Sequence, residues 1–296
     1  MKKKKRLSKT AQVNLLMLAD LGIPEAVHFQ NVLQFSHGVL DVLRHIPMAS
    51  SLPVCISMVS EILYERTNEL IRKNDHPIIL DLACGYSPRV LRVCDSTHIY
   101  VGVDLPDVIE ELRNHREALL SFREETATDY YSVDLTNYDE FRELMKQLQG
   151  EVTVITQGLL TYLTPDQKQV LMDNIRSLLE TTGGCWIIPD SEPARLLPEL
   201  FQAVLGEDGT ALFQQVMAVL DTLVKRDRNK NGWRSADEIC TDLVKNGFQV
   251  QRVSLFSESL TLYSLHQVSQ EIAQKIIENW QTTDALIITA GTKPEN

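Results

Sequence analysis

The sequence lacks the patterns that mark metal-binding, disulfide-linked and membrane-spanning proteins. Its five cysteines are scattered and never spaced as CxxC, and no histidines are placed as HxH or HxxxH, so we expect no structural metal. Unpaired thiols of this kind are typical of a reducing compartment, which predicts a cytoplasmic protein. No stretch of the chain approaches the roughly 18 consecutive apolar residues of a membrane span, and we therefore expect none.

Positive charge is also scarce. The chain has 29 Lys and Arg residues against 40 Asp and Glu residues, and its net charge of −11 argues against a nucleic-acid backbone as its main partner. The one basic run, residues 1–9 (MKKKKRLSK), is expected to be a disordered tail. No long apolar core or small-residue cleavage site follows this run, so a signal peptide is not predicted.

The apolar residues divide the rest of the chain into two parts. Residues 10–74 have helical spacing, broken at Pro24, Pro47 and Pro53, which predicts a helical N-terminal cap of three or four helices. Residues 75–296 alternate short apolar runs with amphipathic segments, which predicts an α/β domain with helices on both faces of a mostly parallel sheet. A helical insertion is expected at about residues 191–232. The predicted strands are residues 78–82, 99–103, 130–133, 152–156, 185–189, 248–255 and 284–290, and the other helices of this domain are residues 105–120, 138–148, 165–179 and 268–280.

Two helix starts have clear capping signals. Thr164 followed by Pro165 predicts an N-cap with proline at the first helical position. Ser235 and Glu238 form the pattern of a capping box, and the helix that they open is expected to end at residues 246–247, where Asn is followed by Gly.

The order of the strands predicts where a ligand binds. Five strand–helix units followed by a terminal strand pair are typical of a fold in which the final strand is inserted antiparallel beside its predecessor. In such open sheets, ligands bind at the carboxyl ends of the strands, at the switch point. The two extra helical segments either enclose a pocket at that edge or pack on the outer faces of the sheet.

The segment from residue 76 to residue 107 is the most informative part of the chain. Gly85, in the turn after the first predicted strand, allows backbone to approach a ligand closely. Asp104 follows 19 residues later, at the end of the second strand, where an acid can accept hydrogen bonds from both ribose hydroxyls. The alternative is a buried strand–helix unit in which Asp104 caps a helix. Cys84 invites comparison with nucleophiles, but no histidine is near it in the sequence.

Four stretches in order resemble one known family: LDLACGYSPRVLR, YVGVDLPDVIEEL, YYSVDLTNYDEF and ITQGLLTYLTPDQ. Over roughly residues 78–179 the chain is similar to class I S-adenosylmethionine-dependent methyltransferases, and most to the leucine carboxyl methyltransferase-like family and its bacterial O-methyltransferase relatives. The resemblance implies a seven-stranded Rossmann-like sheet and S-adenosylmethionine as the cofactor.

The resemblance also implies cofactor-binding residues in the first three turns. Asp81 would bind the cofactor's ammonium, directly or through water, or would instead fix the turn by accepting backbone N–H bonds. Asp104 would hold the ribose hydroxyls. Asp134 would accept from the adenine amino group unless it only caps the next helix. The neighbours expected to line the same site are Ala83, Gly85, Leu105 and Leu135.

Two expected cofactor contacts depart from the family pattern. Gln157 stands where the family usually has Glu, so it keeps an acceptor oxygen for the ammonium but loses the charge. The arginine-bearing signature upstream of the first strand has no clear copy here. Arg44 is the best candidate to bind the cofactor's carboxylate, with a solvated arginine at a helix end as the alternative.

The expected reaction is methyl transfer to a carboxylate or hydroxyl oxygen by in-line displacement. By resemblance, Tyr162 faces the transferred methyl; the alternative is a half-buried packing tyrosine at the start of a helix. A carboxylate acceptor needs no general base but needs a cationic partner, which Arg89 or Arg44 would provide. A phenol acceptor would need a base, for which His45 is the nearest candidate. The acidic composition and the cap favour a small-molecule acceptor over a protein terminus, with neither nucleic acid nor membrane as a partner.

Two other classes of protein compete with this interpretation. An NAD-dependent oxidoreductase would share the strand–helix unit and the acid after the second strand, but its turn would normally carry three glycines, whereas LACGYSP has one. A non-catalytic relative that binds S-adenosylmethionine or a partner is the second alternative, favoured by Gln157 and by the irregular N-terminal region.

Overall fold

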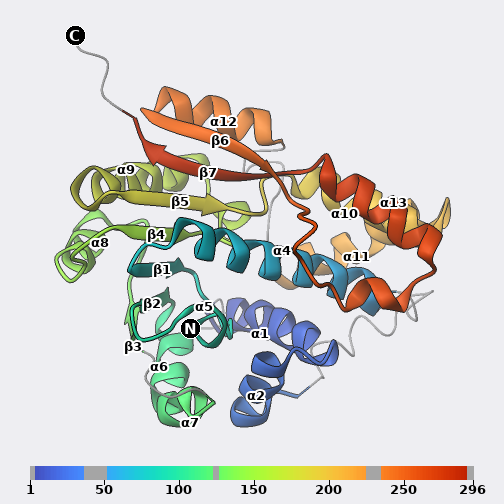
Figure 1. The fold of residues 1–296 in the computed structure, drawn as a ribbon, viewed down its shortest axis with the longest axis horizontal. Helices are drawn as coiled ribbons and strands as arrows, with labels where there is room; N and C mark the ends of the chain where they lie inside the picture. Colours follow the sequence, from blue (N-terminus) through green and yellow to red (C-terminus); the bar gives the residue numbers. More distant parts are fainter. Residues whose placement is uncertain (1–3, 37–51, 123–126, 225–234, 292–296) are drawn as a thin grey trace.

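The computed structural model describes residues 4–36, 52–122, 127–224 and 235–291. Its centre is a seven-stranded sheet in the order β3-β2-β1-β4-β5-β7-β6 (Figure 1). Strand β7 alone runs antiparallel to its neighbours, between β5 and β6, which confirms the mostly parallel sheet with an inserted final strand. The strands are β1 (Ile78–Leu82), β2 (Ile99–Asp104), β3 (Ala127–Ser132), β4 (Val152–Ile155), β5 (Gly184–Ile188), β6 (Phe248–Ser254) and β7 (Asp284–Ala290).

Strand β3 begins earlier than predicted, at Ala127 rather than at residue 130. It is an edge strand of the sheet, and its side chains alternate between buried and solvent-facing positions. Thr128 and Tyr130 are buried, whereas Asp129 between them is exposed. A strand with this alternation has fewer apolar residues than a central strand, so the apolar run in the sequence covers only part of β3.

The two faces of the sheet bury separate hydrophobic clusters, because successive strand side chains point in opposite directions. Ile79 of β1 belongs to the cluster beneath the N-terminal helices, and Leu80 belongs to the cluster on the other face. Residues of three helices, α8 (Tyr138–Met145), α9 (Pro165–Thr182) and α12 (Ala236–Lys245), contribute to the second cluster. The layered arrangement of helix, sheet and helix is visible in Figure 1.

Most of the described residues of the N-terminal segment, 4–36 and 52–74, lie in helices. The described helices are α1 (Lys4–Asp20), α2 (Pro24–Leu33) and α4 (Leu52–Asn74), and Pro24 opens α2 at its first turn. Helix α1 begins at Lys4, so most of residues 1–9 are helical instead of forming the expected disordered tail. Lys and Arg have good helix propensity, and the helix they extend is held by the buried residues from Leu15 to Ala19.

One predicted helix is divided in two. The helix expected over residues 105–120 appears as α6 (Pro106–Asn114) and α7 (Arg116–Leu120), separated by His115 with ψ near 8°. The Nδ1 atom of His115 bonds the carbonyl oxygen of Glu111 at 3.0 Å, and this local contact competes with a continuous helix. Apolar spacing continues across the break, so periodicity alone does not reveal it.

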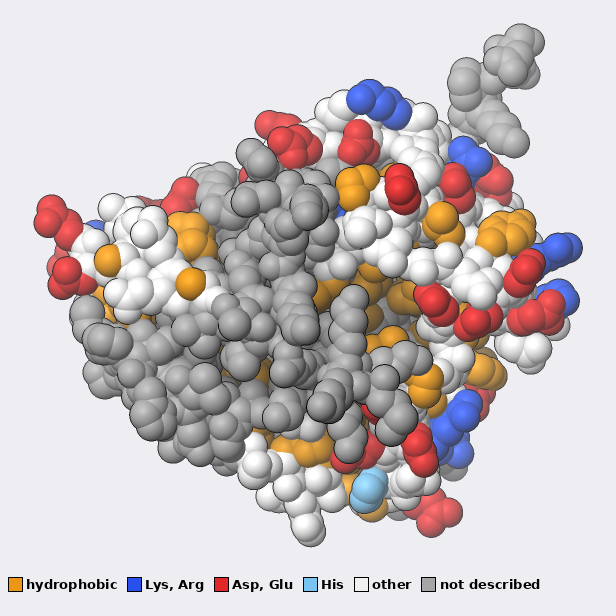
Figure 2. Space-filling model, turned by 180° about the vertical axis from the view of Figure 1, so that it is seen from behind, with side chains coloured by type: hydrophobic (Ala, Val, Ile, Leu, Met, Phe, Trp, Pro, Cys, Tyr) orange, Lys and Arg blue, Asp and Glu red, His pale blue; other side chains and the backbone are white. Residues whose placement is uncertain are grey.

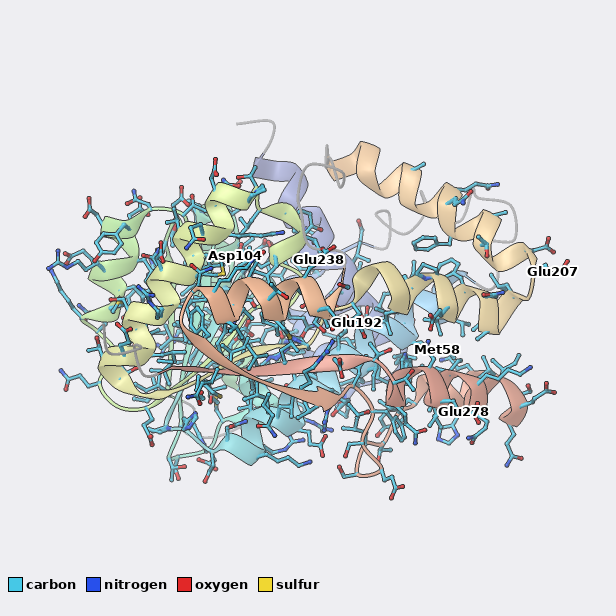
Figure 3. All side chains as sticks on the ribbon, turned by 90° about the horizontal axis from the view of Figure 1, so that it is seen from above. Met58, Asp104, Glu192, Glu207, Glu238 and Glu278 are labelled. Atoms are coloured by element: carbon cyan, nitrogen blue, oxygen red, sulfur yellow. The ribbon has the colours of Figure 1, made fainter. Side chains whose placement is uncertain are left out.

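The second helical stretch forms α10 (Pro193–Leu205) and α11 (Asp208–Val224), which pack against each other. Helix α10 also contacts α4 and α13 (Gln270–Gln281), and α11 contacts α1. Figure 3 labels Glu207 at the turn between α10 and α11, far from Asp104 at the sheet edge. Residues 225–232 of the expected insertion lie outside the described residues. In the described part of the chain, no helix is both long and apolar enough to cross a membrane.

The two helix starts are capped as predicted, one of them only in part. Thr164 and Gln167 form a complete capping box at α9, with Pro165 in the first turn. At α12 the Ser235 side chain accepts from the Glu238 backbone N–H at 3.3 Å, which is one half of the expected box.

Gly184 gives a test of how tightly β4 and β5 pair. Its φ is +94°, and a Cβ at this position would overlap the backbone of Val152, its partner in the ladder. We expect Gly184→Ala to lower the free energy of unfolding by at least about 2 kcal/mol, because strain and overlap act together. The matched control is Gly206→Ala, where φ is +67° and nothing lies within 4 Å. Urea unfolding should show a clearly smaller loss for the control; equal losses would contradict the overlap.

Candidate functional site

The carboxyl ends of β1, β2, β3 and β4 meet at a cavity of about 520 Å³. Figure 3 labels Asp104 at this edge of the sheet. Helices α1 and α4 form further walls, so part of the N-terminal segment encloses the pocket instead of packing on an outer face. Arg44 and the candidate base His45 lie outside the described residues. Every other expected site residue lines this cavity: Asp81, Ala83, Gly85, Arg89, Asp104, Leu105, Asp134, Leu135, Gln157 and Tyr162.

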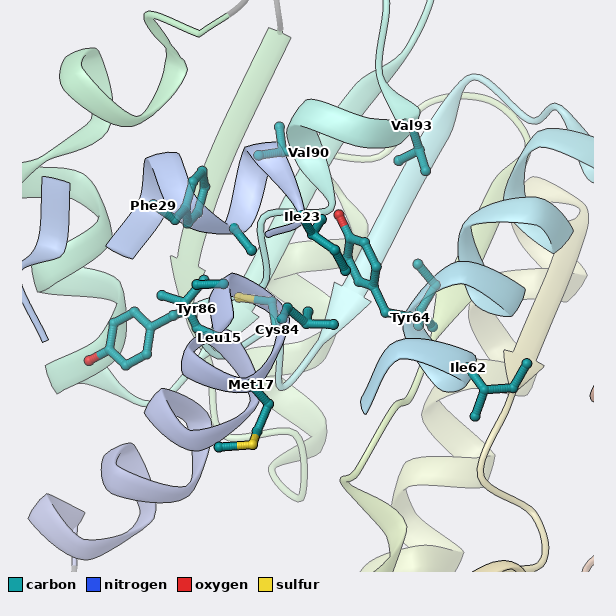
Figure 4. Packing of buried hydrophobic residues seen from close by; sticks show 14 of the residues in the cluster. Leu15, Met17, Ile23, Phe29, Ile62, Tyr64, Cys84, Tyr86, Val90 and Val93 are labelled. Atoms are coloured by element: carbon teal, nitrogen blue, oxygen red, sulfur yellow. The ribbon is translucent and has the colours of Figure 1, made fainter. Parts of the chain in front are cut away.

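The turn after β1 has an unusual backbone that brings α1 close. Ala83 and Gly85 have φ of +60° and +55°, a region that residues with a side chain rarely adopt. A Cβ on Gly85 would lie 3.0 Å from the Cβ of Ala11 in α1. In Figure 4, Cys84 and Tyr86 of this turn face α1 and its Leu15, and all three belong to one buried cluster. Glycine is therefore required here for contact with a helix as well as for the turn.

Asp104 ties the turn to the end of β2. Its Oδ2 accepts from the Gly85 backbone N–H at 2.7 Å and its Oδ1 from the Leu105 N–H at 2.6 Å. A carboxylate offers about four lone-pair directions, so each oxygen keeps one for a ligand hydroxyl. Burial raises the pKa of Asp104, while the two backbone donors act in the opposite direction.

Asp81 and Arg89 form a buried ion pair at the centre of the site. The Nε atom of Arg89 lies 3.3 Å from Asp81 Oδ2, and both side chains are almost completely buried. The hydroxyl of Tyr100 donates to the same carboxylate oxygen at 2.9 Å. Burial raises the pKa of Asp81, opposed by the Arg89 guanidinium and the Tyr100 hydroxyl. Asp81 thus accepts a hydrogen bond from Tyr100 and forms an ion pair with Arg89, the N-cap residue of α5 (Val90–Val93).

Gln157 is oriented by the same arginine. Its Oε1 accepts from Arg89 Nη2 at 2.7 Å. A guanidinium only donates hydrogen bonds, so the amide oxygen of Gln157 must face Arg89. The N–H donors of the Gln157 amide nitrogen remain available for other partners. The oxygen expected to accept from the cofactor's ammonium is therefore already engaged by Arg89.

Tyr64 of α4 covers one face of the guanidinium. Its ring centroid lies 5.6 Å from Arg89 Cζ, a cation–π distance, and its hydroxyl donates to Glu25 of α2 at 3.1 Å. Arg92, on the opposite side of Glu25, lies 3.6 Å from it and 3.2 Å from Glu65. A chain of polar contacts thus links the site to the N-terminal helices.

The loop after β3 presents Asp134 and Leu135 to the cavity. Asp134 is exposed, and its Oδ1 accepts from the backbone N–H and the hydroxyl of Thr136 at 3.0 and 2.7 Å. The cap of the next helix is Asn137, whose side chain accepts from Asp139 and Glu140 N–H groups. Asp134 therefore does not cap α8, which removes the alternative explanation for its position.

Tyr162 lies on the wall of the cavity that follows β4. It ends the short 3-10 helix η1 (Leu160–Tyr162), and its neighbours Leu159 and Leu163 line the cavity too. This position is compatible with both expected roles of Tyr162, facing the reacting groups and packing.

Cys84 has no features of a nucleophile. Its side chain is 7% exposed, and its Sγ lies 3.6 Å from the Gly85 carbonyl oxygen. Burial raises the pKa of the thiol, and the nearby carboxylates of Asp104 and Asp81 raise it further. A thiol in this state stays protonated at neutral pH, and only the thiolate attacks.

Several lining residues were not expected from the sequence. Among them are Ala11 and Asn14 of α1, Val59, Ser60 and Leu63 of α4, and Ser87 of the turn. Ser87 carried a usable signal, since it is a polar residue inside the glycine turn. The residues of α1 and α4 carried no such signal. Contacts between distant parts of the chain decide which face of each helix meets the sheet.

Comparisons with known proteins agree with this geometry. The family model described as leucine carboxyl methyltransferase matches residues 64–176. A solved structure of a putative methyltransferase from Thermobifida fusca is 14% identical, with a TM-score of 0.53 over 89% of this chain and 93% of that one. Human N-acetylserotonin methyltransferase in complex with S-adenosylmethionine is 16% identical, with a TM-score of 0.45 over 93% of this chain and 62% of that one. Among curated proteins, none matches the sequence.

The family match covers the part of the chain that forms the site. Residues 64–176 contain β1 to β4 and the described site residues from Asp81 to Tyr162. The Thermobifida fusca structure shows that the fold is shared. The residues fit S-adenosylmethionine, the expected cofactor: the turn at Gly85 admits close approach, and Asp104 keeps acceptor positions for two hydroxyls.

Thiol reactivity tests the environment of Cys84. We expect iodoacetamide to alkylate Cys84 more slowly than Cys240, which is only partly buried, because burial and two carboxylates keep the Cys84 thiol protonated. Mass spectrometry of tryptic peptides measures both rates. In urea both cysteines should react alike. Faster alkylation of folded Cys84 would show a reactive thiolate and contradict the burial argument.

Proposed function

We propose that this methyltransferase transfers the methyl group of S-adenosylmethionine to a carboxylate or hydroxyl oxygen of a small molecule. The observation that carries the proposal is the convergence of Asp81, Gly85, Asp104, Asp134 and Gln157 with Tyr162 on one cavity at the switch edge of the sheet. The cofactor supplies an activated methyl group, so the protein has to bind, align and exclude water.

The cavity offers a distinct contact for each polar part of the cofactor. Asp104 accepts from the ribose hydroxyls with the lone pairs that its backbone donors leave free. Asp134 accepts from the adenine amino group with the oxygen that Thr136 does not use, and Leu135 offers its backbone N–H to the ring. Asp81 supplies negative charge for the ammonium, while Gln157, turned by Arg89, offers its amide nitrogen as a donor.

The acceptor occupies the side of the cavity formed by Tyr162, Leu163 and the α4 residues Val59 and Leu63. These apolar walls keep water away from the methyl group and hold the attacking oxygen in line. A carboxylate acceptor is ionised at neutral pH and needs no base; a hydroxyl acceptor has to lose its proton during the reaction.

Several features support a small acceptor and a cytoplasmic location. Helices α1 and α4 act as a cap, since they wall the cavity and restrict it to molecules that fit inside. Acidic side chains are prominent around the described parts of the face in Figure 2, which disfavours nucleic acid. All five cysteines are free, as expected in a reducing compartment.

A non-catalytic relative remains the second candidate, and one observation favours it. Gln157 replaces the usual Glu, so it brings no charge to the ammonium, and Arg89 already occupies one of the two lone pairs of its oxygen. Cofactor binding without turnover on any carboxylic acid or phenol would support this second function.

Cofactor binding is the first test. Calorimetric titration should give micromolar binding of S-adenosylmethionine and none of NAD. Asp104→Ala should weaken binding at least about tenfold, because it removes the ribose acceptor and the partner of two backbone N–H groups. Asp107→Ala, an exposed acid three residues away, is the matched control and should bind normally. No binding by a folded wild-type protein would refute the proposal.

Tyr162 is tested through turnover. With an acceptor found in a panel of carboxylic acids and phenols, Tyr162→Leu should lower kcat about tenfold or more, because the attacking oxygen loses its alignment, while the cofactor Kd stays constant. Tyr138→Leu, at an exposed tyrosine outside the cavity, should leave kcat unchanged. An unaltered kcat in Tyr162→Leu would leave Tyr162 a packing residue only.

A further inference from the structure

The charged side chains that line the cavity are mostly acidic. Among the described lining residues, Asp81, Asp104 and Asp134 are acids and Arg89 is basic. In their ionised forms, these three acids and one base give the lining a formal charge of −2. S-adenosylmethionine adds one positive charge, at its sulfonium, because its amino-acid end is a zwitterion. The loaded cavity therefore keeps an excess of negative charge, which repels an anionic acceptor and leaves a neutral one unaffected.

The positive charge of Arg89 is already balanced inside the protein. Asp81 lies 3.3 Å from Arg89 Nε, and Gln157 accepts from Nη2 at 2.7 Å. The ring of Tyr64 covers one face of the guanidinium. A carboxylate acceptor beside this pair would bring a second negative charge for one positive charge, in a region closed off from solvent. Arg89 is thus engaged in the protein and is not the cationic partner that a carboxylate acceptor needs.

Neutral polar side chains of α1 and α4 lie in the wall of the same cavity. Asn14 of α1 is half-buried, and Ser60 of α4 is 8% exposed. Neither side chain has a hydrogen bond with another described residue. Ser57, one turn earlier in α4, instead donates to Met17 Sδ of α1 at 3.5 Å. An amide and a hydroxyl each donate and accept, so Asn14 and Ser60 suit a neutral group such as a hydroxyl or a carbonyl.

We propose that the acceptor is a neutral hydroxyl compound with an apolar body, hydrogen-bonded by Asn14 and Ser60, and not a carboxylate. Its hydroxyl oxygen forms the bond to the methyl carbon, the carbon–sulfur bond breaks with its electron pair going to sulfur, and the hydroxyl proton passes to water. Positive charge moves from sulfur towards oxygen in this step, and the acidic lining stabilises it there. This inference rests on the proposed function, whose acceptor it narrows from two classes to one.

Naphthol, naphthamide and naphthoate, substituted at the same ring position, test the preference for a neutral acceptor. The protein is first saturated with sinefungin, a cofactor analogue that carries an amine in place of the methyl sulfonium and has no methyl group to transfer. By calorimetry, the two neutral compounds should bind at least about fivefold more tightly than naphthoate, because only the anion adds negative charge.

Variants of the two wall residues test their hydrogen bonds. Ser60→Ala and Asn14→Leu should each weaken naphthamide binding about three- to tenfold, because each removes one hydrogen-bonding group, and should leave the sinefungin Kd within about twofold. The matched control is Ser177→Ala, on α9 outside the cavity, which should bind all these compounds normally. Unchanged naphthamide binding in both variants would contradict the contacts with Asn14 and Ser60.

A second measurement identifies the bond that the enzyme makes. With methyl-labelled S-adenosylmethionine and the panel of carboxylic acids and phenols, label should enter ethers, which resist alkali, and not esters, which release methanol in alkali. Alkali-labile label, tighter binding of naphthoate, or failure of both neutral compounds to bind would overturn the inference. Loss of tight naphthoate binding in Arg44→Gln would then identify the cation responsible. No binding of sinefungin by the folded protein would instead refute the proposed function itself.

Discussion

The ion pair between Asp81 and Arg89 joins the end of β1 to the start of α5, away from solvent. Desolvating two charges is costly, and further hydrogen bonds to both partners help to offset that cost. Here Tyr100 from β2 completes the carboxylate and Gln157 from the end of β4 takes part of the guanidinium. Loss of either charge would leave the other uncompensated, at a cost of about 3–5 kcal/mol. The pair therefore connects the end of β1, the start of α5, β2 and the end of β4.

The same pair explains why the N-terminal helices belong to the site. The guanidinium is covered by Tyr64, which is tied to Glu25, and Gly85 lies against Ala11. Segments that precede the sheet in the sequence thus close the side of the turn that the sheet leaves open. The cavity depends on contacts between distant parts of the chain, and substitutions in α1, α2 or α4 can disturb it without touching a ligand.

The sequence predicted those features that local chemistry decides. Apolar runs located the strands, Thr164 and Pro165 marked a helix start, and Asp104 at the end of β2 faces Gly85 as the spacing implied. Two features were missed for different reasons. The break at His115 leaves the apolar spacing intact, so periodicity does not reveal it. The orientation of Gln157 depends on a long-range contact with Arg89, 68 residues away. No local sequence pattern indicates that the Arg89 side chain contacts Asp81 and Gln157 rather than an acceptor.

The position of β7 has a consequence for how the molecule forms during synthesis. Strand β6 is made before β7, yet within the described sheet its neighbour is β7 alone, on which it depends for its pairing. A nascent chain that has exposed residues 248–254 but not residues 284–290 carries β5 and β6 with open edges, a state that favours association with other chains. The pairing of β7 with β5 and β6 must then be a late event of biogenesis. Ribosome pausing between these two strands would prolong the vulnerable interval.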